Sequence, residues 1–171
     1  MSSCLTRPAT LRDAKSVAEI HLGAAHPSGT AASAVLTPRA LGFDRQQVFW
    51  REAIEYGEPQ IYVACDADAV VGFVGFDRCR DKGSPPSMGE IWSIYVLPAC
   101  WDRGFGLALW DAARDGLLEE GCTDVSVWVP LGNERAMRFH ELAGFKREMA
   151  SARTVPVDSV RVEEIRLKRK L

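Results

Sequence analysis

The twenty residues from Glu90 to Leu109 constrain the fold of this chain more than any other stretch. The first seven are apolar, aromatic or β-branched except for Glu90 and Ser93, which predicts a mostly buried strand. Pro98 ends that strand because proline has no N–H to donate to a neighbouring strand. Beyond a glycine-containing turn, apolar residues recur at helical spacing at Leu107, Ala108, Leu109, Ala112, Ala113, Leu117 and Leu118. The stretch therefore predicts a strand, a turn and a helix with one apolar face.

The turn before this helix, Arg103-Gly104-Phe105-Gly106, is suited to bind an anion. The first N–H groups of a helix have no intrahelical partner, and the helix dipole is positive at that end. Glycines let an anion approach the backbone closely. Glycine before a helix is also typical of a plain turn, and the dinucleotide-binding pattern would need a glycine in place of Leu109. The turn is thus a candidate phosphate or pyrophosphate site that needs further support.

Two sequence blocks supply that support. Residues 101–106 read Trp-Asp-Arg-Gly-Phe-Gly, and residues 133–145 read Asn-Glu-Arg-Ala-Met-Arg-Phe-His-Glu-Leu-Ala-Gly-Phe. They resemble two motifs of the Gcn5-related N-acetyltransferase (GNAT) superfamily, Arg/Gln-x-x-Gly-x-Gly/Ala and Asn-x-x-Ala-x-x-Phe-Tyr-x-x-x-Gly-Phe. The chain departs from these motifs at Trp101, where Arg103 is expected to supply the positive charge instead, and at His140, which replaces the tyrosine. The order and spacing of the two blocks fit the family.

The resemblance covers nearly the whole chain and implies its fold. The hydrophobic pattern predicts the order β-α-α-β-β-β-α-β-α-β-β, which indicates an α/β (α+β) domain with a mixed central sheet. In the GNAT fold, which has this order, the fourth and fifth strands splay apart and the pantetheine arm of coenzyme A lies between them. With 171 residues, of which 47% are hydrophobic, the chain is expected to form a single N-acetyltransferase domain over 1–171.

The resemblance also assigns a cofactor site for acetyl-CoA. The free edge of the central strand is expected to pair with the pantetheine amides, as in strand addition, and the glycine turn is expected to hold the pyrophosphate by its backbone amides. The residues expected to contact the cofactor are Ile94, Tyr95, Val96, Asp102, Arg103, Gly104, Phe105, Gly106 and Asn133. Asn133 also suits a helix N-cap, and the two roles are compatible. No metal site is predicted, because His21 and His26 have no carboxylate pattern beside them.

Two residues are candidates for proton transfer. Glu90 lies among apolar residues of the central strand, where burial raises the pKa of a carboxylate toward that of a useful base. It also falls where histone-acetylating members of the family carry their general base, although an exposed edge residue or a structural ion pair is the alternative. His140 occupies the place of a tyrosine that protonates the departing thiolate, and it is expected to take that role, to line the pantetheine channel, or to pack as a plain helix residue.

Two further interpretations concern the surroundings of this site. Trp101 is interpreted as a core residue, with packing against the phosphate turn as the alternative. Residues 27–43 are rich in Ser, Thr, Ala and Gly, which predicts a loop. By resemblance this loop lies over the acceptor pocket and contacts the substrate, and a plain surface connection is the alternative.

Composition narrows the possible partners and location. A formal net charge of −2 gives no general attraction to nucleic acid or anionic membranes. Five scattered cysteines without a Cys-x-x-Cys pair argue against a disulfide framework or zinc site and favour a reducing, cytoplasmic location. No signal peptide and no long apolar run is found.

The sequence thus predicts an acetyltransferase that moves an acetyl group from acetyl-CoA to a primary amine by direct attack in a ternary complex. The acceptor, a small-molecule or peptide amine, has no sequence signature, and a homodimer is expected only because dimers are common in the family it resembles. One alternative is a non-catalytic acyl-CoA-binding or sensor domain on the same fold. Another is a nucleotide-binding protein unrelated to coenzyme A.

Overall fold

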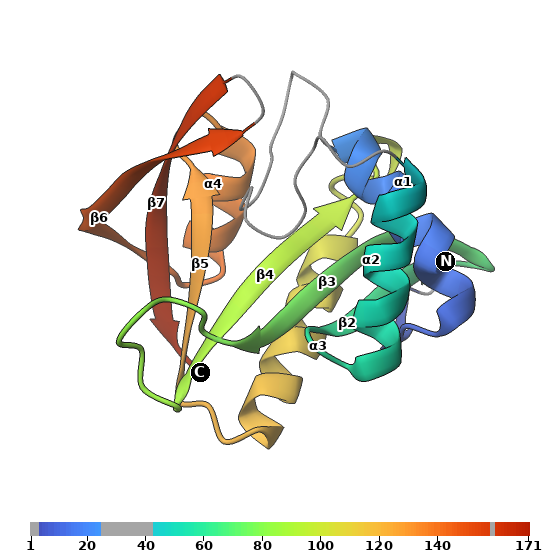
Figure 1. Cartoon of the computed structure of the whole chain (residues 1–171), viewed down its shortest axis with the longest axis horizontal. Coiled ribbons are helices and arrows are strands. Elements are labelled where there is room, and N and C mark those ends of the chain that lie inside the picture. Colours follow the sequence, from blue (N-terminus) through green and yellow to red (C-terminus); the bar gives the residue numbers. More distant parts are fainter. Residues whose placement is uncertain (1–3, 25–42, 158–159) are drawn as a thin grey trace.

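The structure, a computed structural model, describes residues 4–24, 43–157 and 160–171 (Figure 1). In chain order the strands and helices are β1 (Cys4–Pro8), α1 (Ala14–Ala24), α2 (Phe43–Tyr56), β2 (Gln60–Asp66), β3 (Ala69–Arg78), β4 (Met88–Val96), α3 (Phe105–Glu119), β5 (Asp124–Pro130), α4 (Glu134–Leu142), β6 (Lys146–Val157) and β7 (Val160–Lys170). Short 3-10 turns, η1 (Leu11–Asp13) and η2 (Pro98–Cys100), precede α1 and α3. This confirms the predicted order of helices and strands. The predicted loop at 27–43 lies almost wholly outside the described residues.

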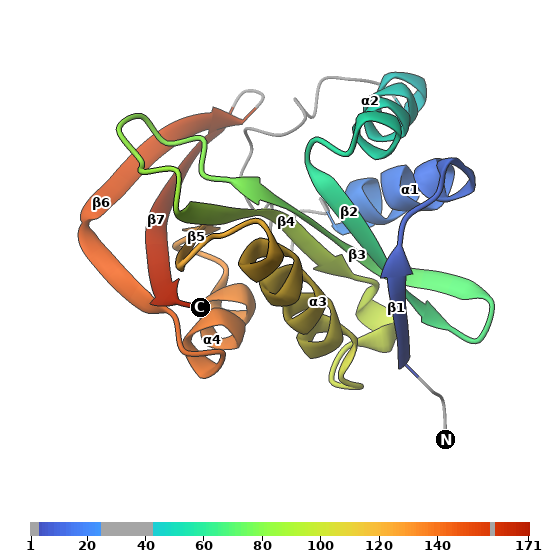
Figure 2. The ribbon, with the colours of Figure 1, turned by 90° about the horizontal axis from the view of Figure 1, so that it is seen from below.

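The described strands form one seven-stranded sheet in the order β1-β2-β3-β4-β5-β7-β6. Neighbouring strands are antiparallel except β4 and β5, which are parallel and are connected through α3. Figure 2 shows α1 and α2 on one face of the sheet and α3 and α4 on the other. We call these the α1/α2 face and the α3/α4 face. Among the described helices, none is long and apolar enough to cross a membrane.

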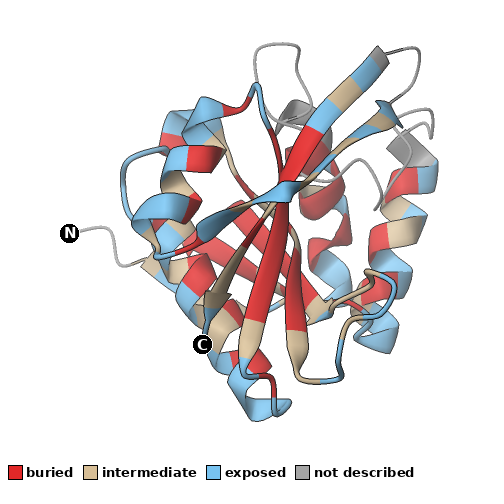
Figure 3. Cartoon of the chain, turned by 90° about the vertical axis from the view of Figure 1, so that its left-hand side faces the viewer, coloured by how far each residue is buried: buried red, intermediate tan, exposed pale blue. Residues whose placement is uncertain are grey.

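The core consists of two apolar clusters, one on each face of the sheet. Strand β3 supplies both, because the run from Val71 to Phe76 is buried throughout. Figure 3 shows buried residues gathered along the middle of the sheet. On the α3/α4 face, Val127 and Val129 of β5 pack in the same cluster as Leu109 of α3. Alternate residues of a strand point to opposite faces, so Ser126, Trp128 and Pro130 of β5 face the other way.

Strands β4 and β5 pair over only part of their length. Their register runs from Met88 opposite Asp124 to Ile91 opposite Val127. Beyond that point β4 pairs only with β3, and β5 pairs only with β7. The edge of β4 from Trp92 to Val96 is therefore open toward β5, which confirms the predicted splay. A register shift leaves Trp92 without a partner on β3, and a bulge of this kind bends a strand away from its neighbour.

Candidate active site

The N-terminus of α3 lies beyond the open end of β4 and forms a cradle of backbone N–H groups. Gly104 is the N-cap residue, with φ 88° and ψ 0°, and no side chain caps the helix. The first helical hydrogen bond recorded there runs from the Ala108 N–H to the Gly104 carbonyl, at 3.1 Å. The N–H groups of the first turn have no intrahelical acceptor, so they are available to an anion.

The two glycines of this turn serve different purposes. A Cβ at Gly104 would meet nothing within 4 Å, but its positive φ of 88° is one that other residues rarely adopt. A Cβ at Gly106 would lie 3.2 Å from the Phe139 ring of α4. Gly104 therefore permits the turn, whereas Gly106 permits close packing of α3 against α4. Asp102 also has a positive φ, 60°, so the turn enters the helix through two left-handed positions.

The charged side chains of the turn already have partners within the protein. Arg103 donates to Asp66 at 2.9 Å, and its guanidinium lies 5.2 Å from the centre of the Phe105 ring. Asp102 accepts from Arg135 of α4 at 2.9 Å. The backbone amides, rather than a cation free of partners, are thus the main feature that the turn offers to a phosphate.

Trp101 is not a core residue, and its interpretation as one is wrong. It is 38% exposed, because the turn that carries it runs along the surface. Its indole N–H donates to the Val96 carbonyl at 2.8 Å, and the Arg135 guanidinium stacks on its ring at 4.0 Å. Trp101 therefore links the open end of β4, the glycine turn and the start of α4.

Asn133 lies just beyond the end of β5, on the other side of the gap. Its Oδ1 accepts from the Ala136 N–H at 2.9 Å, which confirms the predicted N-cap of α4. The residue is only 5% exposed, and its Nδ2 has no hydrogen-bond partner among the described residues. A buried donor without an acceptor is uncommon in a native protein, so Nδ2 is a natural contact for a ligand carbonyl.

Glu90, the candidate base, lies in the last paired part of β4, next to Ser126 of β5. It is 1% exposed and is bonded to Arg80 of the β3–β4 loop. Arg80 donates through Nη2 to Oε2 at 2.6 Å and through its backbone N–H to Oε1 at 3.0 Å. The Arg80 guanidinium also stacks on the Trp92 ring at 4.0 Å. Glu90 is therefore buried on the α1/α2 face in an ion pair, the predicted alternative to an exposed edge residue, although the sequence did not indicate Arg80 as the partner.

A second buried glutamate lies across the gap, on β7. Glu164 is 1% exposed, and its Oε1 accepts from Nε and Nη2 of Arg153 on β6, each at 2.8 Å. Arg153 stacks on Trp128 of β5 with 3.5 Å between its guanidinium carbon and the ring centre. Burial raises the pKa of the Glu164 carboxyl, with small additions from Asp81 and Glu90, and Arg153 opposes the rise. This group was not predicted from the sequence.

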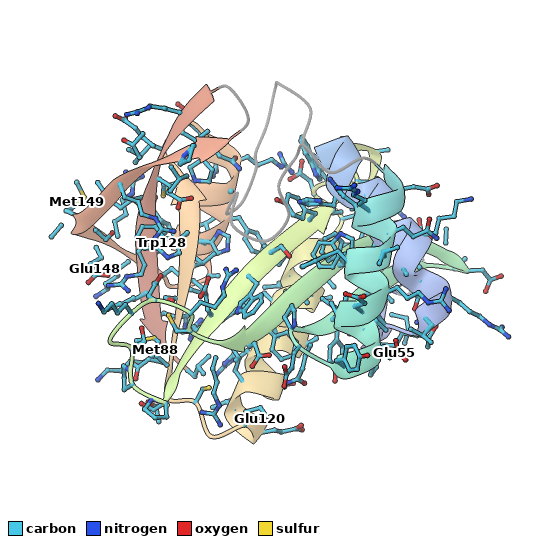
Figure 4. All side chains as sticks on the ribbon, in the orientation of Figure 1. Glu55, Met88, Glu120, Trp128, Glu148 and Met149 are labelled. Atoms are coloured by element: carbon cyan, nitrogen blue, oxygen red, sulfur yellow. The ribbon has the colours of Figure 1, made fainter. Side chains whose placement is uncertain are left out.

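The β3–β4 loop is fixed over this part of the α1/α2 face by Asp81. Its carboxylate accepts from the Trp128 indole at 3.0 and 3.1 Å and from Arg166 of β7 at 3.0 Å. Arg166 also donates to Glu148 of β6 at 2.6 Å. Figure 4 shows Trp128 and Glu148 on this half of the sheet, which none of the described helices covers on the α1/α2 face. The only sequence signal for these ion-paired residues on the α1/α2 face was the alternation of polar and apolar residues from Glu164 to Lys168.

His140 is buried between the rings of Phe139 in α4 and of Phe145, the residue just before β6. Its Nδ1 lies 2.8 Å from the Ala136 carbonyl, so Nδ1 carries the proton and donates it. Burial lowers the pKa of His140 to about 4, and the bond to Ala136 opposes this only in part. At neutral pH the ring is therefore uncharged, with Nε2 as an acceptor.

The low pKa of His140 predicts a loss of stability in acid. The unfolded chain takes up a proton near the ordinary pKa of 6.5, whereas the folded chain does so only near pH 4. The neutral ring therefore makes its full contribution to the free energy of unfolding above pH 6.5. This contribution, about 3 kcal/mol, is lost as the pH falls to 4. Urea unfolding at several pH values in this window should show a smaller loss for His140→Gln than for the native chain. Equal losses in both proteins would contradict this assignment.

The site therefore combines an open strand edge, an anion cradle and a buried donor around the gap between β4 and β5, with two ion-paired glutamates on the α1/α2 face. Several solved structures with this fold are described as acetyltransferases. An N-acetyltransferase from Staphylococcus aureus Mu50 superimposes with a TM-score of 0.79 at 20% identity, and the alignment covers 99% of both chains. The protein yncA from Salmonella typhimurium, described as an acetyltransferase with its cofactor acetyl-CoA, gives a TM-score of 0.78 at 23% identity over 99% of this chain and 95% of the other.

Sequence comparison gives the family. The sequence model of the acetyltransferase (GNAT) family matches residues 32–145. The chain belongs to this family, and the predicted resemblance is confirmed. A mycothiol acetyltransferase of Kocuria rhizophila is 34% identical over 48% of this chain and 27% of its own length, and one of Rhodococcus erythropolis is 27% identical over 69% of this chain and 42% of its own. The chain thus spans less than half the length of these relatives.

Proposed function

We propose that the protein is an N-acetyltransferase that moves an acetyl group from acetyl-CoA to a primary amine. The observation that carries this proposal is the gap where β4 and β5 part, which has the amide cradle of α3 at one end. The family of the chain supports the reaction class, and the structural relative described with acetyl-CoA supports the cofactor.

The residues present fit this cofactor. The open edge from Ile94 to Val96 would hold the pantetheine arm, and the buried Nδ2 of Asn133 would donate to one of its carbonyls. The backbone of 102–106 would hold the pyrophosphate. Bound acetyl-CoA supplies an activated thioester. The Val96 carbonyl accepts from the Trp101 indole and keeps a second lone pair for a pantetheine amide.

The acceptor enters from the α1/α2 face, where Glu90 lies. The ammonium group of the acceptor must lose one proton before it can react, and Glu90 accepts that proton through water. The nitrogen of the neutral amine then attacks the thioester carbonyl, so that a C–N bond forms and the C–S bond breaks. The nitrogen loses its second proton, and the departing thiolate takes up one proton to give free coenzyme A. An N–H of the β4 edge stabilises the charge that develops on the carbonyl oxygen.

The acid role of His140 stays a prediction. A neutral ring that already donates its Nδ1 proton to Ala136 has none to give at Nε2. His140 would protonate the thiolate only if cofactor binding raised its pKa. The buried, neutral ring fits either of the other two predictions, a residue that lines the pantetheine channel or a packed residue of the helix.

The acceptor, the domain organisation and the location of the protein are also matters of proposal. The mycothiol acetyltransferases share too small a part of their length with this chain to assign an acceptor. A single domain over 1–171, a cytoplasmic location, a homodimer and the absence of nucleic-acid partners are proposed on sequence grounds alone.

The proposed function is tested by calorimetric titration of the protein with acetyl-CoA, ATP and NAD, followed by a screen of amines for release of free coenzyme A. We expect acetyl-CoA to bind and ATP and NAD not to compete with it. Binding without turnover of any amine would favour the acyl-CoA sensor, for which the missing tyrosine is the only sequence support. Binding of ATP or NAD by a protein that does not bind coenzyme A would favour a nucleotide-binding protein.

A further inference from the structure

Two similar groups of side chains flank the point where β4 and β5 part. The last paired residues are Ile91 and Val127, and the next residue on each strand is a tryptophan, Trp92 or Trp128. Each tryptophan carries a stacked arginine, and each arginine bonds a buried glutamate. We call them the β4 triad (Glu90, Arg80, Trp92) and the β5 triad (Glu164, Arg153, Trp128).

Both triads lie on the α1/α2 face of the sheet. Ile91 and Val127 pack in the cluster on the α3/α4 face, so Glu90 and Trp128, their chain neighbours, point the other way. Consecutive residues of the β3–β4 loop join the triads, because Arg80 bonds Glu90 and the next residue, Asp81, accepts from Trp128. An acceptor that approaches the gap from this face would lie between the triads.

In each triad, the arginine side chain is exposed to solvent and the glutamate side chain is buried beneath it. The side chains of Arg80 and Arg153 are 25% and 36% exposed, whereas those of both glutamates are 1% exposed. Arg153 uses Nε and Nη2 for Glu164, and its Nη1 has no partner among the described residues. A planar guanidinium held on an indole, with donors still free, is a good receptor for a carboxylate.

The ion pairs around the gap are balanced in charge. Four carboxylates (Asp81, Glu90, Glu148 and Glu164) face four cations (Arg80, Arg153, Arg166 and Lys168) in these pairs. A purely cationic acceptor, such as a polyamine, would meet a guanidinium beside each of the two buried glutamates. An acceptor that brings one positive and one negative group leaves every charge paired.

We propose that the acceptor is a small amine that also carries a carboxylate, and that Arg153 binds this carboxylate while the amine lies toward Glu90. This inference rests on the proposed acetyl transfer and names its substrate class. Arg153 is thereby a specificity residue, held in place by Trp128 and Glu164.

The test compares amino acids with their decarboxylated amines: L-phenylalanine with phenethylamine, L-tryptophan with tryptamine, L-histidine with histamine, and L-ornithine with putrescine. The two members of a pair differ only in the carboxylate. Acetylation is followed through the release of free coenzyme A, and binding without acetyl-CoA is measured by calorimetry. The variants are Arg153→Gln and, as a control on the same strand, Arg147→Gln, which removes an exposed ion pair with Glu141.

We expect the native protein to favour the amino acid of at least one pair in kcat/KM, by about 10–100-fold, the effect of one charged hydrogen-bonded contact. Arg153→Gln should bring that ratio close to one, and Arg147→Gln should leave it unchanged. The two kcat/KM values of each ratio are measured on the same protein preparation. A smaller fraction of folded protein lowers both values equally and leaves the ratio unchanged.

Three results would overturn the inference: equal or better use of the decarboxylated amines, a ratio that Arg153→Gln leaves unchanged, or acetylation of neither member of any pair by a protein that binds acetyl-CoA. Failure of acetyl-CoA to bind would instead count against the proposed function. In that case the calorimetric preference for amino acids, and its loss in Arg153→Gln, would still decide whether Arg153 recognises a carboxylate.

Discussion

Replacing Glu90 by glutamine is expected to lower kcat/KM for acetyl transfer by about 10²–10⁴-fold, the usual contribution of a positioned proton acceptor. Glutamine keeps the shape of the side chain and can still accept from the Arg80 N–H, but it cannot take up a proton. The substitution also leaves the Arg80 guanidinium without its anionic partner. A loss of stability is therefore expected together with the loss of activity, and the two have to be separated.

Asp13→Asn is the matched control, because it removes another buried carboxylate paired with an arginine, Arg7, at 2.7 Å, in η1 and away from the gap. This variant should lose stability and keep its kcat/KM. The measurement is the pH profile of kcat/KM for the native protein, Glu90→Gln and Asp13→Asn. If Glu90→Gln kept both the native rate and the native profile, Glu90 would not be the base, and Glu164 would be the next carboxylate to change.

Replacing Gly104 by valine is expected to raise the dissociation constant of acetyl-CoA by about 100-fold. The φ of 88° is strained for a β-branched residue, so the turn must rearrange and its amides no longer converge on one anion. Loss of two charge-assisted hydrogen bonds, at about 1.5 kcal/mol each, corresponds to this factor.

The opposite end of the same helix provides the control. Gly121 follows α3, has φ 83°, and like Gly104 would place a Cβ in open space. Gly121→Val should thus impose a similar backbone strain without touching the cradle. Calorimetric titration of both variants with acetyl-CoA checks the prediction. Equal affinities for the two variants would show that the α3 N-terminus does not hold the pyrophosphate.

The elements were predictable because their signals are local. The buried strand from Glu90, its end at Pro98 and the apolar face of the following helix depend on residues close together in the chain. The glycine turn and the Asn133 cap are also local, since a left-handed φ or a side chain that caps the next turn needs no distant partner. The splay of β4 and β5 came from the family resemblance.

The surroundings of the candidate site were not predictable in this way. Trp101 was interpreted as core, but the shape of the turn holds it at the surface, where Arg135 stacks on its ring. His140 was a candidate proton donor, yet the rings of Phe139 and Phe145 exclude the water that its charged form requires.

What the sequence by itself determined is the order of elements, the glycine turn before α3 and the position of Glu90 in β4, since each follows from local conformation or from a motif. The tertiary structure alone decided which charges meet. Glu90 pairs with an arginine ten positions away, Glu164 with one eleven positions away, and Arg166 with Asp81 across 85 positions. Burial and pairing depend on how the strands come together in space, because the energy of a buried charge is fixed by its neighbours and not by its place in the chain.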